Sequence, residues 1–347
     1  MKTLLTFLFS FILAYLTTPL FRRMAVALNI MDLPNHRKIH KQATPLLGGV
    51  AIYLGFICAL LFNFSVINWY LFLPLLIGAT LLLITGIIDD IRGLSANSRL
   101  VVQLAVSFLI VFVANIHVDF LPKVWWKDIG EIIITIIWII GVTNAFNYLD
   151  GLDGLATGSA VINLFCFSAI LFRSNQYQLV ILAVALMGAC LGFLPYNLKK
   201  AKIFLGDAGS TLLGYIMAVL AVAGYWAVDN IVGITVPVLI MGVPIFDMVF
   251  TTVMRIKEKK ISNIKEWLEY GAKDHFHHYL VDLGLSKFSA VLFIYAVTFS
   301  LGISAIMVSN DFSSEAYLSL AQAFLIFTII AVLIVVGKRR RSGWGKD

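Results

Sequence analysis

The segment Asn144-Ala-Phe-Asn-Tyr-Leu-Asp-Gly-Leu-Asp-Gly-Leu-Ala156 lies between two long apolar runs of this chain. Its carboxylates, Asp150 and Asp153, are therefore expected at or near a membrane boundary, where a charge is costly and usually functional. Their i, i+3 spacing would place both on one face if the segment is helical. Gly151 and Gly154 remove bulk beside them, so that a phosphate or another helix could approach the backbone closely. The alternative is a plain turn between two helices, but a turn does not need two acids in register with two glycines.

The sequence on both sides of this segment has the composition of a membrane protein. Of 347 residues, 60% are hydrophobic and only 13% are charged. Apolar runs reach the roughly 20 residues that cross a bilayer core. The three cysteines are scattered within such runs, which argues against a disulfide framework or a zinc site. We predict an all-α polytopic membrane protein that forms a single domain over 1–347.

About eleven apolar runs are long enough to be membrane spans. The first is interpreted as a retained span rather than a signal peptide, because it lacks a small-x-small cleavage site and is followed by Arg22 and Arg23. The alternative is ten spans with one re-entrant run. The predicted spans lie at about 3–21, 48–66, 70–88, 99–116, 129–146, 157–173, 178–196, 209–226, 231–254, 288–308 and 317–337.

The basic residues predict the orientation of these spans. The loops and tail on one side hold all of the 26 Lys and Arg residues except Lys2, Lys123, Lys127 and Arg173. Because cytoplasmic loops carry the excess of Lys and Arg, we place the amino terminus outside and the carboxyl terminus in the cytoplasm. The net charge of +7 therefore reflects topology, and no nucleic-acid partner is expected. The basic tail 338–347 is expected to anchor to anionic lipid.

Every polar, Gly-rich cluster of the sequence falls in a loop on this cytoplasmic side, which indicates an active site there. The first loop, 32–49, carries several cations, among them Lys41, and ends at Gly48-Gly49. Cations suit phosphate groups, and paired glycines allow close packing where the next helix begins. Basic charge alone is typical of any cytoplasmic loop beside a membrane, so the combination with the glycines is what favours a site.

Asp89 and Asp90 end an apolar run, where adjacent carboxylates repel each other and the helix dipole opposes them. A divalent cation or a cationic partner would relieve both costs. The alternative is structural pairing with Arg92 or Arg99. Adjacent carboxylates point in different directions on a helix, so at most one is expected to face a given metal.

The loop Lys202-Ile-Phe-Leu-Gly-Asp-Ala-Gly-Ser-Thr211 precedes another apolar run. Gly206, Gly209 and Ser210 would place small residues and free backbone N–H groups at a helix start, which is a natural phosphate site. Asp207 among them is a hard oxygen ligand that suits Mg²⁺ or Mn²⁺. The alternative is that Asp207 is an N-cap.

The longest loop, 257–287, carries three of the six histidines together with Lys273: His275, His277 and His278. No cysteine lies nearby, and the spacing fits no ordinary zinc site. Imidazoles grouped with a lysine can instead bind a diphosphate or move protons near neutral pH.

Asp247, within the span before this loop, is expected to be a buried acid paired with a basic or polar neighbour. The carboxylates, basic loops and Gly-lined helix starts together predict phosphoryl transfer at a membrane surface, in which a metal neutralises charge on the phosphates. The nucleotide would come from the cytoplasm and the second substrate from the bilayer.

The joint pattern resembles the polyprenyl-phosphate N-acetylhexosamine-1-phosphate transferase family, and its motifs follow the family's order over about 32–280. The x-His-x-His-His loop resembles the UDP-GlcNAc:undecaprenyl-phosphate branch rather than the three consecutive histidines of the muramoyl-pentapeptide branch. One departure is that the family's acidic-basic pair before the histidines appears here as Ala272-Lys273, with Asp274 displaced by two positions. The matching motifs are Pro45-Leu-Leu-Gly-Gly49, Asp89-Asp90, Asn144-x-x-Asn-x-x-Asp-Gly-Leu-Asp-Gly154, Phe204-Leu-Gly-Asp-Ala-Gly-Ser-Thr211 and His275-Phe-His-His278.

The resemblance implies a Mg²⁺-dependent reaction, with Mn²⁺ as a substitute. Asp207 would be the main metal ligand, with Asp89 or Asp90 assisting, and one of that pair would deprotonate or orient the lipid phosphate. Asp153 would lie with the diphosphate or the metal. The histidine loop would hold the sugar phosphate through His275, His277, His278 and Lys273.

At the nucleotide, the resemblance implies that Asn147 and Asp150 bind the uridine side. Phe204 would stack on the base, and Lys41 would lie near the nucleotide.

The implied activity is transfer of GlcNAc-1-phosphate from UDP-GlcNAc to undecaprenyl phosphate, with release of UMP. The product would be the first lipid-linked intermediate of a surface polysaccharide (O-antigen, common antigen or teichoic acid), made at the bacterial cytoplasmic (inner) membrane. The implied partners are a UDP-N-acetylhexosamine, undecaprenyl phosphate and the lipid bilayer, and related proteins suggest a homodimer. The alternatives are the same reaction with another UDP-N-acetylhexosamine or UDP-MurNAc-pentapeptide and, from another class, a proton-coupled transporter.

Overall fold

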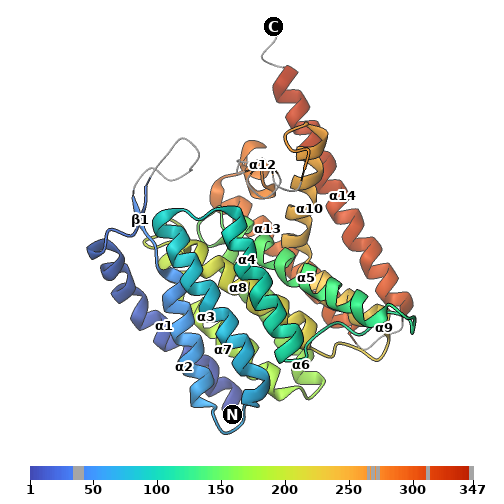
Figure 1. Ribbon diagram of the computed structural model, residues 1–347. Coiled ribbons are helices and arrows are strands. Elements are labelled where there is room, and N and C mark those ends of the chain that lie inside the picture. The colour runs from blue at the N-terminus through green and yellow to red at the C-terminus, as the bar shows by residue number, and fades with distance from the viewer. Residues whose placement is uncertain (34–42, 264–265, 267–269, 271–273, 310–312, 344–347) are drawn as a thin grey trace.

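The computed structural model describes residues 1–33, 43–263, 266, 270, 274–309 and 313–343 (Figure 1). It confirms the predicted all-α class, and adds a two-residue antiparallel pair in which Met31 faces Pro45. The elements in chain order are α1 (Lys2–Ala27), β1 (Met31–Asp32), β2 (Thr44–Pro45), α2 (Gly48–Phe62), α3 (Trp69–Arg92), α4 (Ala96–Phe108) with a π-helical continuation (Leu109–Val113), α5 (Lys127–Leu149), α6 (Leu155–Arg173), α7 (Tyr177–Asn197), α8 (Gly206–Ala223), α9 (Asn230–Ile240), α10 (Gly242–Lys257), α12 (Phe276–Asp282), α13 (Lys287–Val308) and α14 (Ser313–Gly343).

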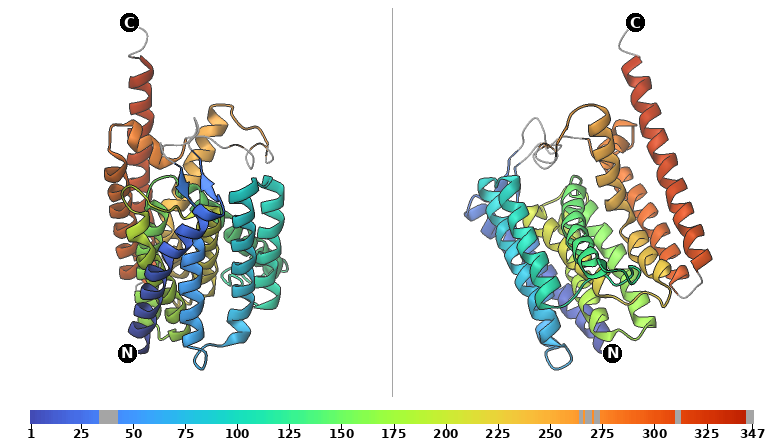
Figure 2. Two further views of the ribbon diagram at one scale, coloured as in Figure 1. Left: turned by 90° about the vertical axis from the view of Figure 1, so that its left-hand side faces the viewer. Right: turned by 45° about the vertical axis from the view of Figure 1, so that its right-hand side comes forward.

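Each predicted span coincides with a helix or a helix pair. Within the described ranges, nine helices are long and apolar enough to cross a membrane, and α9 with α10 would make a tenth. The remaining predicted span corresponds to α2, a shorter apolar helix of 15 residues. The protein is therefore a multi-pass membrane protein, while the number of crossings stays a prediction. Figure 2 shows the two termini at opposite ends of the bundle, as an odd number of crossings requires.

The span predicted over 231–254 is a bent pair of helices, because α9 and α10 meet at an angle of 77°. The break lies at Met241. Pro244 has no N–H to bond the carbonyl oxygen of Ile240, which interrupts the helical hydrogen bonds at this point, and proline suits the first turn of a new helix. The bend lets α10 pack against α12 and α14 at the end of the bundle that carries β1 (Figure 1).

The central helix is α8, which packs against α2, α3 and α5. Small residues allow this approach: a Cβ on Gly49 would lie 3.0 Å from the backbone carbon of Ala208, and a Cβ on Gly86 would lie 2.8 Å from that of Asp207. Close backbone contact through small residues is the usual way in which membrane helices associate. The start of α8 is therefore held between α2 and α3.

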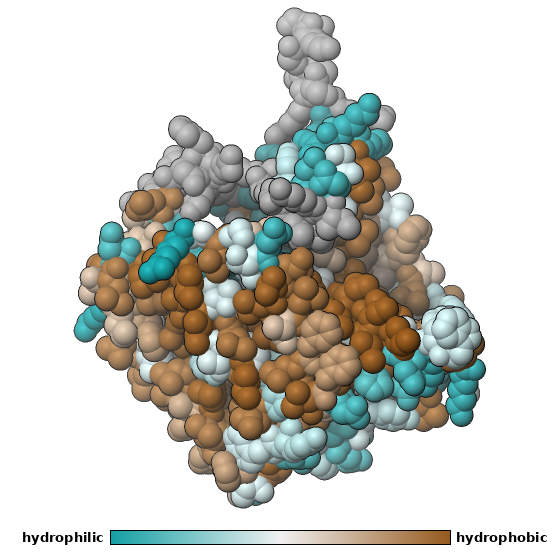
Figure 3. All heavy atoms as spheres, in the orientation of Figure 1, coloured by the Kyte–Doolittle hydropathy of each residue, from teal (hydrophilic) through white to brown (hydrophobic). Residues whose placement is uncertain are grey.

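The outer helices present apolar side chains to their surroundings. In the apolar 18-residue stretch of α1, only 22% of the residues are buried inside the protein, and in that of α14 only 17% are buried. Figure 3 shows hydrophobic residues across the side of the bundle and hydrophilic ones gathered toward its ends. This distribution is what a bilayer requires of the surface that it contacts.

Candidate active site

The segment 144–156 forms the end of α5, a short connection and the start of α6. Helix α5 ends at Leu149, and Gly154 has a left-handed φ of 77° immediately before α6. Asp150 and Asp153 thus lie in the connection, not on one helical face. Burial raises the pKa of Asp150 to about 8, and the carboxylates of Asp207, Asp153 and Asp32 add to the effect. At neutral pH Asp150 therefore keeps its proton and can donate a hydrogen bond.

The two glycines of the segment allow two different close contacts. A Cβ on Gly151 would lie 2.6 Å from Cε1 of His277, and a Cβ on Gly154 would lie 2.6 Å from Cδ1 of Leu198. The carbonyl oxygen of Gly154 also accepts a hydrogen bond of 2.5 Å from the hydroxyl of Tyr295. Protein side chains, not a phosphate, therefore occupy the space that the missing Cβ atoms leave.

Asp153 anchors the connection between α7 and α8. Its Oδ2 accepts hydrogen bonds of 3.0 Å from the backbone N–H groups of Lys200 and Ala201. Lys199 and Lys200 have left-handed φ values of 47° and 68°, a conformation that such bonds help to hold. The predicted role of Asp153 at the diphosphate or metal stays a prediction beside this structural one.

Asn147 joins α5 to the start of α8. Its Nδ2 donates to Oδ1 of Asp207 at 2.6 Å and to Oγ of Ser210 at 3.0 Å. Asp207 is the second residue of α8, and the N-cap position is Leu205, with no side-chain cap bond. The alternative that Asp207 is an N-cap was therefore wrong.

Asp90 occupies the backbone donors at the start of α8. Its Oδ1 accepts the N–H of Asp207 at 2.9 Å, and its Oδ2 accepts that of Ala208 at 3.3 Å. Gly206 makes room for this carboxylate, because a Cβ there would lie 2.5 Å from Oδ2 of Asp90. The expectation of free N–H groups for a phosphate at this helix start was wrong for these two groups.

Asp89 has different hydrogen-bond partners from Asp90, as expected for adjacent residues on a helix. Its Oδ1 accepts the N–H of Leu94 at 2.6 Å, and its Oδ2 lies 3.2 Å from Nη1 of Arg99. The carboxyl groups of Asp89 and Asp207 are also close enough to interact. Asp89 therefore faces Asp207 on one side and a guanidinium on the other.

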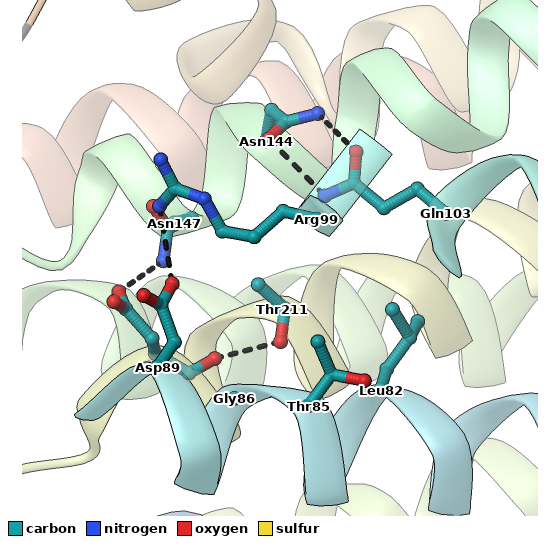
Figure 4. Close-up of a pocket in the computed structure, with 10 residues that line it drawn as sticks. Leu82, Thr85, Gly86, Asp89, Arg99, Gln103, Asn144, Asn147 and Thr211 are labelled. Carbon is teal, nitrogen blue, oxygen red and sulfur yellow. Dashed lines mark hydrogen bonds and ion pairs between the residues drawn. The ribbon is translucent and has the colours of Figure 1, made fainter. Parts of the chain in front are cut away.

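A pocket opens beside these groups between α3, α4, α5 and α8 (Figure 4). Arg99 and Asn147 point toward Asp89 in it, and Gln103 and Asn144 face each other across α4 and α5. The latter two exchange amide hydrogen bonds of 2.9 and 3.2 Å. Sequence reasoning considered Arg99 only as a structural partner and missed Gln103, whose signal was a lone amide within an apolar run.

The donor set fits a hard cation in part. Within the described part of the chain, no three His, Cys, Asp or Glu side chains are arranged to enclose a metal ion. Mg²⁺, however, is usually held by one or two carboxylates together with waters and substrate phosphates. The facing carboxylates of Asp207 and Asp89 match that pattern. Both oxygens of Asp90 accept backbone N–H groups, and both oxygens of Asp89 are engaged by Leu94 and Arg99, so assistance to the metal by either residue stays a prediction.

The histidine loop meets the end of α5. His275 precedes α12, and its ring lies 4.9 Å from that of Tyr148. His277 is 1% exposed and lies 4.2 Å from the ring of His278, centroid to centroid. Burial, followed by the charge of His278, lowers the pKa of His277 to about 3. His277 is therefore neutral at physiological pH, and it cannot contribute a positive charge toward a diphosphate.

Three predicted substrate residues remain. Lys41 and Lys273 lie outside the described residues. Phe204 is half-buried, and its backbone bonds to Pro45 and Gly48 hold the loop 203–205 beside the start of α2. Its stacking on a base stays a prediction.

Comparisons with known proteins show the family of this chain. A family model described as glycosyl transferase family 4 matches residues 72–225. A probable undecaprenyl-phosphate N-acetylglucosaminyl 1-phosphate transferase of Bacillus subtilis (strain 168) is 33% identical over 342 residues, which cover 97% of this chain and 92% of that protein. A decaprenyl-phosphate N-acetylglucosaminephosphotransferase of Mycolicibacterium smegmatis is 30% identical, with coverages of 82% and 76%. An undecaprenyl-phosphate alpha-N-acetylglucosaminyl 1-phosphate transferase of Escherichia coli (strain K12) is 28% identical, with coverages of 84% and 81%.

The first of these relatives matches nearly the whole chain, and the family model covers α3 to α8, which carry Asp89, Asn147 and Asp207. The chain belongs to glycosyl transferase family 4, the polyprenyl-phosphate N-acetylhexosamine-1-phosphate transferases.

Proposed function

We propose that the protein transfers GlcNAc-1-phosphate from UDP-GlcNAc to undecaprenyl phosphate and releases UMP. In this reaction an oxygen of the lipid phosphate forms a bond to the sugar-bearing phosphorus, and the bond from that phosphorus to the UMP oxygen breaks. Relatives named for this activity support the proposal. The observation that carries it is the cluster of Asp89, Asn147 and Asp207 beside Arg99 at one end of an apolar bundle.

The cluster suits a reaction between a soluble and a lipid substrate. Asp207, oriented by Asn147, and Asp89 would hold Mg²⁺, which would neutralise charge on the phosphates. Arg99 can release Asp89 and donate to a phosphate oxygen, since a guanidinium suits both anions. Protonated Asp150 can donate a hydrogen bond to an acceptor oxygen on the nucleotide. We place this site at the cytoplasmic face of the bacterial inner membrane.

Exchange of radioactive UMP into UDP-GlcNAc tests the proposal with purified protein, Mg²⁺ and undecaprenyl phosphate. A panel of UDP-N-acetylhexosamines and UDP-MurNAc-pentapeptide in the same assay identifies the sugar. Absence of exchange with every donor would refute the transferase reaction. Exchange only with a donor other than UDP-GlcNAc would show that this other UDP-sugar is the substrate.

Replacing Asp207 with Asn tests the metal role. The change keeps the hydrogen bond to Asn147 within reach but removes the charge, so activity should fall by at least about 100-fold. Activity near that of the wild type would remove Asp207 from the metal site. Thermal unfolding of the variant serves as the control for folding.

A further inference from the structure

Three polar side chains lie one helical turn apart on one face of α10: Asp247, Thr251 and Arg255. All three are buried, with exposed fractions of 0%, 2% and 2%. Buried polar groups in a helix require partners, and burying a charge without one is costly. The partners lie in the segment 274–276, where the histidine loop enters α12.

The contacts form a ladder along α10. Oδ1 of Asp247 accepts the backbone N–H of Phe276 at 2.6 Å. One turn on, Oγ1 of Thr251 lies 3.2 Å from the carbonyl oxygen of Asp274. One turn further, Arg255 donates through Nε and Nη2 to the carboxylate of Asp274 at 3.0 and 2.7 Å. The ladder therefore fixes both the backbone and the first side chain of this segment.

The ring of His275 lies between two residues of the same helix face, Asp247 and Arg255. Its Nδ1 lies 3.3 Å from Oδ2 of Asp247, and its Nε2 lies 3.4 Å from Nη2 of Arg255. A carboxylate can only accept hydrogen bonds and a guanidinium can only donate them. A proton on Nδ1 and a lone pair on Nε2 would suit these two neighbours, although the contact between Nδ1 and Oδ2 does not have hydrogen-bond geometry.

The surroundings of His277, two residues on, offer still fewer polar contacts than those of His275. Neither of its ring nitrogens has a hydrogen-bond partner within the described part of the chain, although the ring is buried. The ring lies against Gly151, at the connection that also holds Asp150. An unpaired buried imidazole costs stability, and its retention favours a role toward a ligand.

We propose that Asp247 and His275 are positioning residues of the transferase site: they place His277 and do not touch the substrate themselves. The kinetic effects expected below rest on the proposed function. The structural effects rest only on the contacts between α10 and the segment 274–276. The proposal gives His275 and His277 different roles, although the sequence motif alone does not distinguish them.

Asp247→Asn tests the first half of the proposal. The side-chain amide keeps one acceptor oxygen, so its NH₂ group must face either the N–H of Phe276 or Nδ1–H of His275, and both are donors. A displacement of about 1 Å near reacting groups costs on the order of 100-fold. We expect kcat/KM for UDP-GlcNAc to fall between about 10-fold and 100-fold, with KM for undecaprenyl phosphate unchanged. Wild-type kcat/KM would overturn the proposal.

Paired variants of His275 test the second half. The Nδ2 of an asparagine at this position can take the place of Nδ1–H and donate to Asp247, whereas an alanine cannot. We expect His275→Asn to retain activity within about tenfold of the wild type and His275→Ala to lose about 100-fold. If both lose activity equally, His275 acts on the substrate itself and the proposal fails.

Hydrogen exchange measures the ladder without any substrate. Thr251→Val and Asp247→Asn should both speed exchange over 274–282 by about tenfold. Thr298→Val is the matched control, since the buried Thr298 hydroxyl returns to the carbonyl of Ile294 in its own helix at 2.8 Å. Unchanged exchange in the two α10 variants would overturn the ladder. An enzyme inactive toward every UDP-sugar would refute the proposed function and leave this measurement interpretable.

Discussion

Replacing Gly151 with alanine tests whether the end of α5 lies against the histidine loop. A Cβ at this position would lie 2.6 Å from Cε1 and 3.1 Å from Cδ2 of His277. Ordinary van der Waals contact begins at 3.4 Å, and Nε2 of His277 would lie closer still than Cε1, so the ring or the backbone must retreat by more than about 0.8 Å. The ring of His278, 4.2 Å away, limits that movement. The displacement is therefore passed on to the connection that carries Asp150.

The expected magnitudes follow from this distance. Gly151 is exposed but the ring of His277 is buried, and overpacking against a buried side chain costs about 1–3 kcal/mol. Alanine restricts the unfolded chain more than glycine does and returns about 0.4–1 kcal/mol, because Gly151 is not in the left-handed region. The free energy of unfolding should thus fall by about 1–2 kcal/mol. A shift near 1 Å at the site should lower kcat/KM on the order of 100-fold.

Steady-state rates and thermal unfolding of the purified variant measure the two effects. Gly233→Ala in α9 is the matched control, because a Cβ there has no heavy atom within 4 Å and the backbone φ is not left-handed. It should keep wild-type activity and gain up to about 1 kcal/mol of stability. A Gly151→Ala protein with wild-type kcat/KM and melting temperature would refute the contact with His277.

Three further outcomes are expected. Because the pKa of Asp150 is raised to about 8, its contribution to stability is present below about pH 4 and is lost as the pH rises through about 8. The melting temperature of Asp150→Asn should therefore gain on that of the wild type between pH 5 and 8, and a constant difference would contradict this. Asp153→Asn weakens two charge-assisted bonds in the α7–α8 connection and should cost about 1 kcal/mol in thermal unfolding. Lys338→Ala breaks a partly exposed ion pair with Glu258, so unfolding should change by less than about 1 kcal/mol, and a larger loss would show that α14 supports α10.

The helices of this protein could be predicted from sequence because a bilayer leaves few choices. An apolar run of sufficient length must satisfy its backbone internally, and a helix does so. The bend between α9 and α10 could not be placed in the same way. Pro237 and Pro244 are compatible with a continuous kinked span as well as with a break of 77°. Packing of α10 against α12 and α14 decides between them, and no local pattern contains that information.

The residues of the site could be predicted from the sequence, but their hydrogen-bond partners could not. Asp89, Asp90 and Asp207 stood out because acids at the ends of apolar runs are costly. Which group each acid would meet depends on how α3 and α8 pack. Asp90 takes the backbone donors that sequence reasoning left for a phosphate, and Arg99 takes Asp89. Hydrogen-bond partners across helices are set by tertiary distance, which spacing along one helix does not encode.

The spacing of residues at the end of α5 explains how one segment contacts both the carboxylate cluster around Asp207 and the histidine loop. Consecutive residues of an α-helix are rotated by about 100° from each other. Asn147 therefore faces Asp207 while Tyr148, the next residue, faces His275. Helix α5 ends one residue later, and the connection turns Gly151 toward the histidine loop as well. A one-residue insertion ahead of Asn147 would rotate both contacts by about 100° at once, so the carboxylate half and the histidine half of the site share a single register.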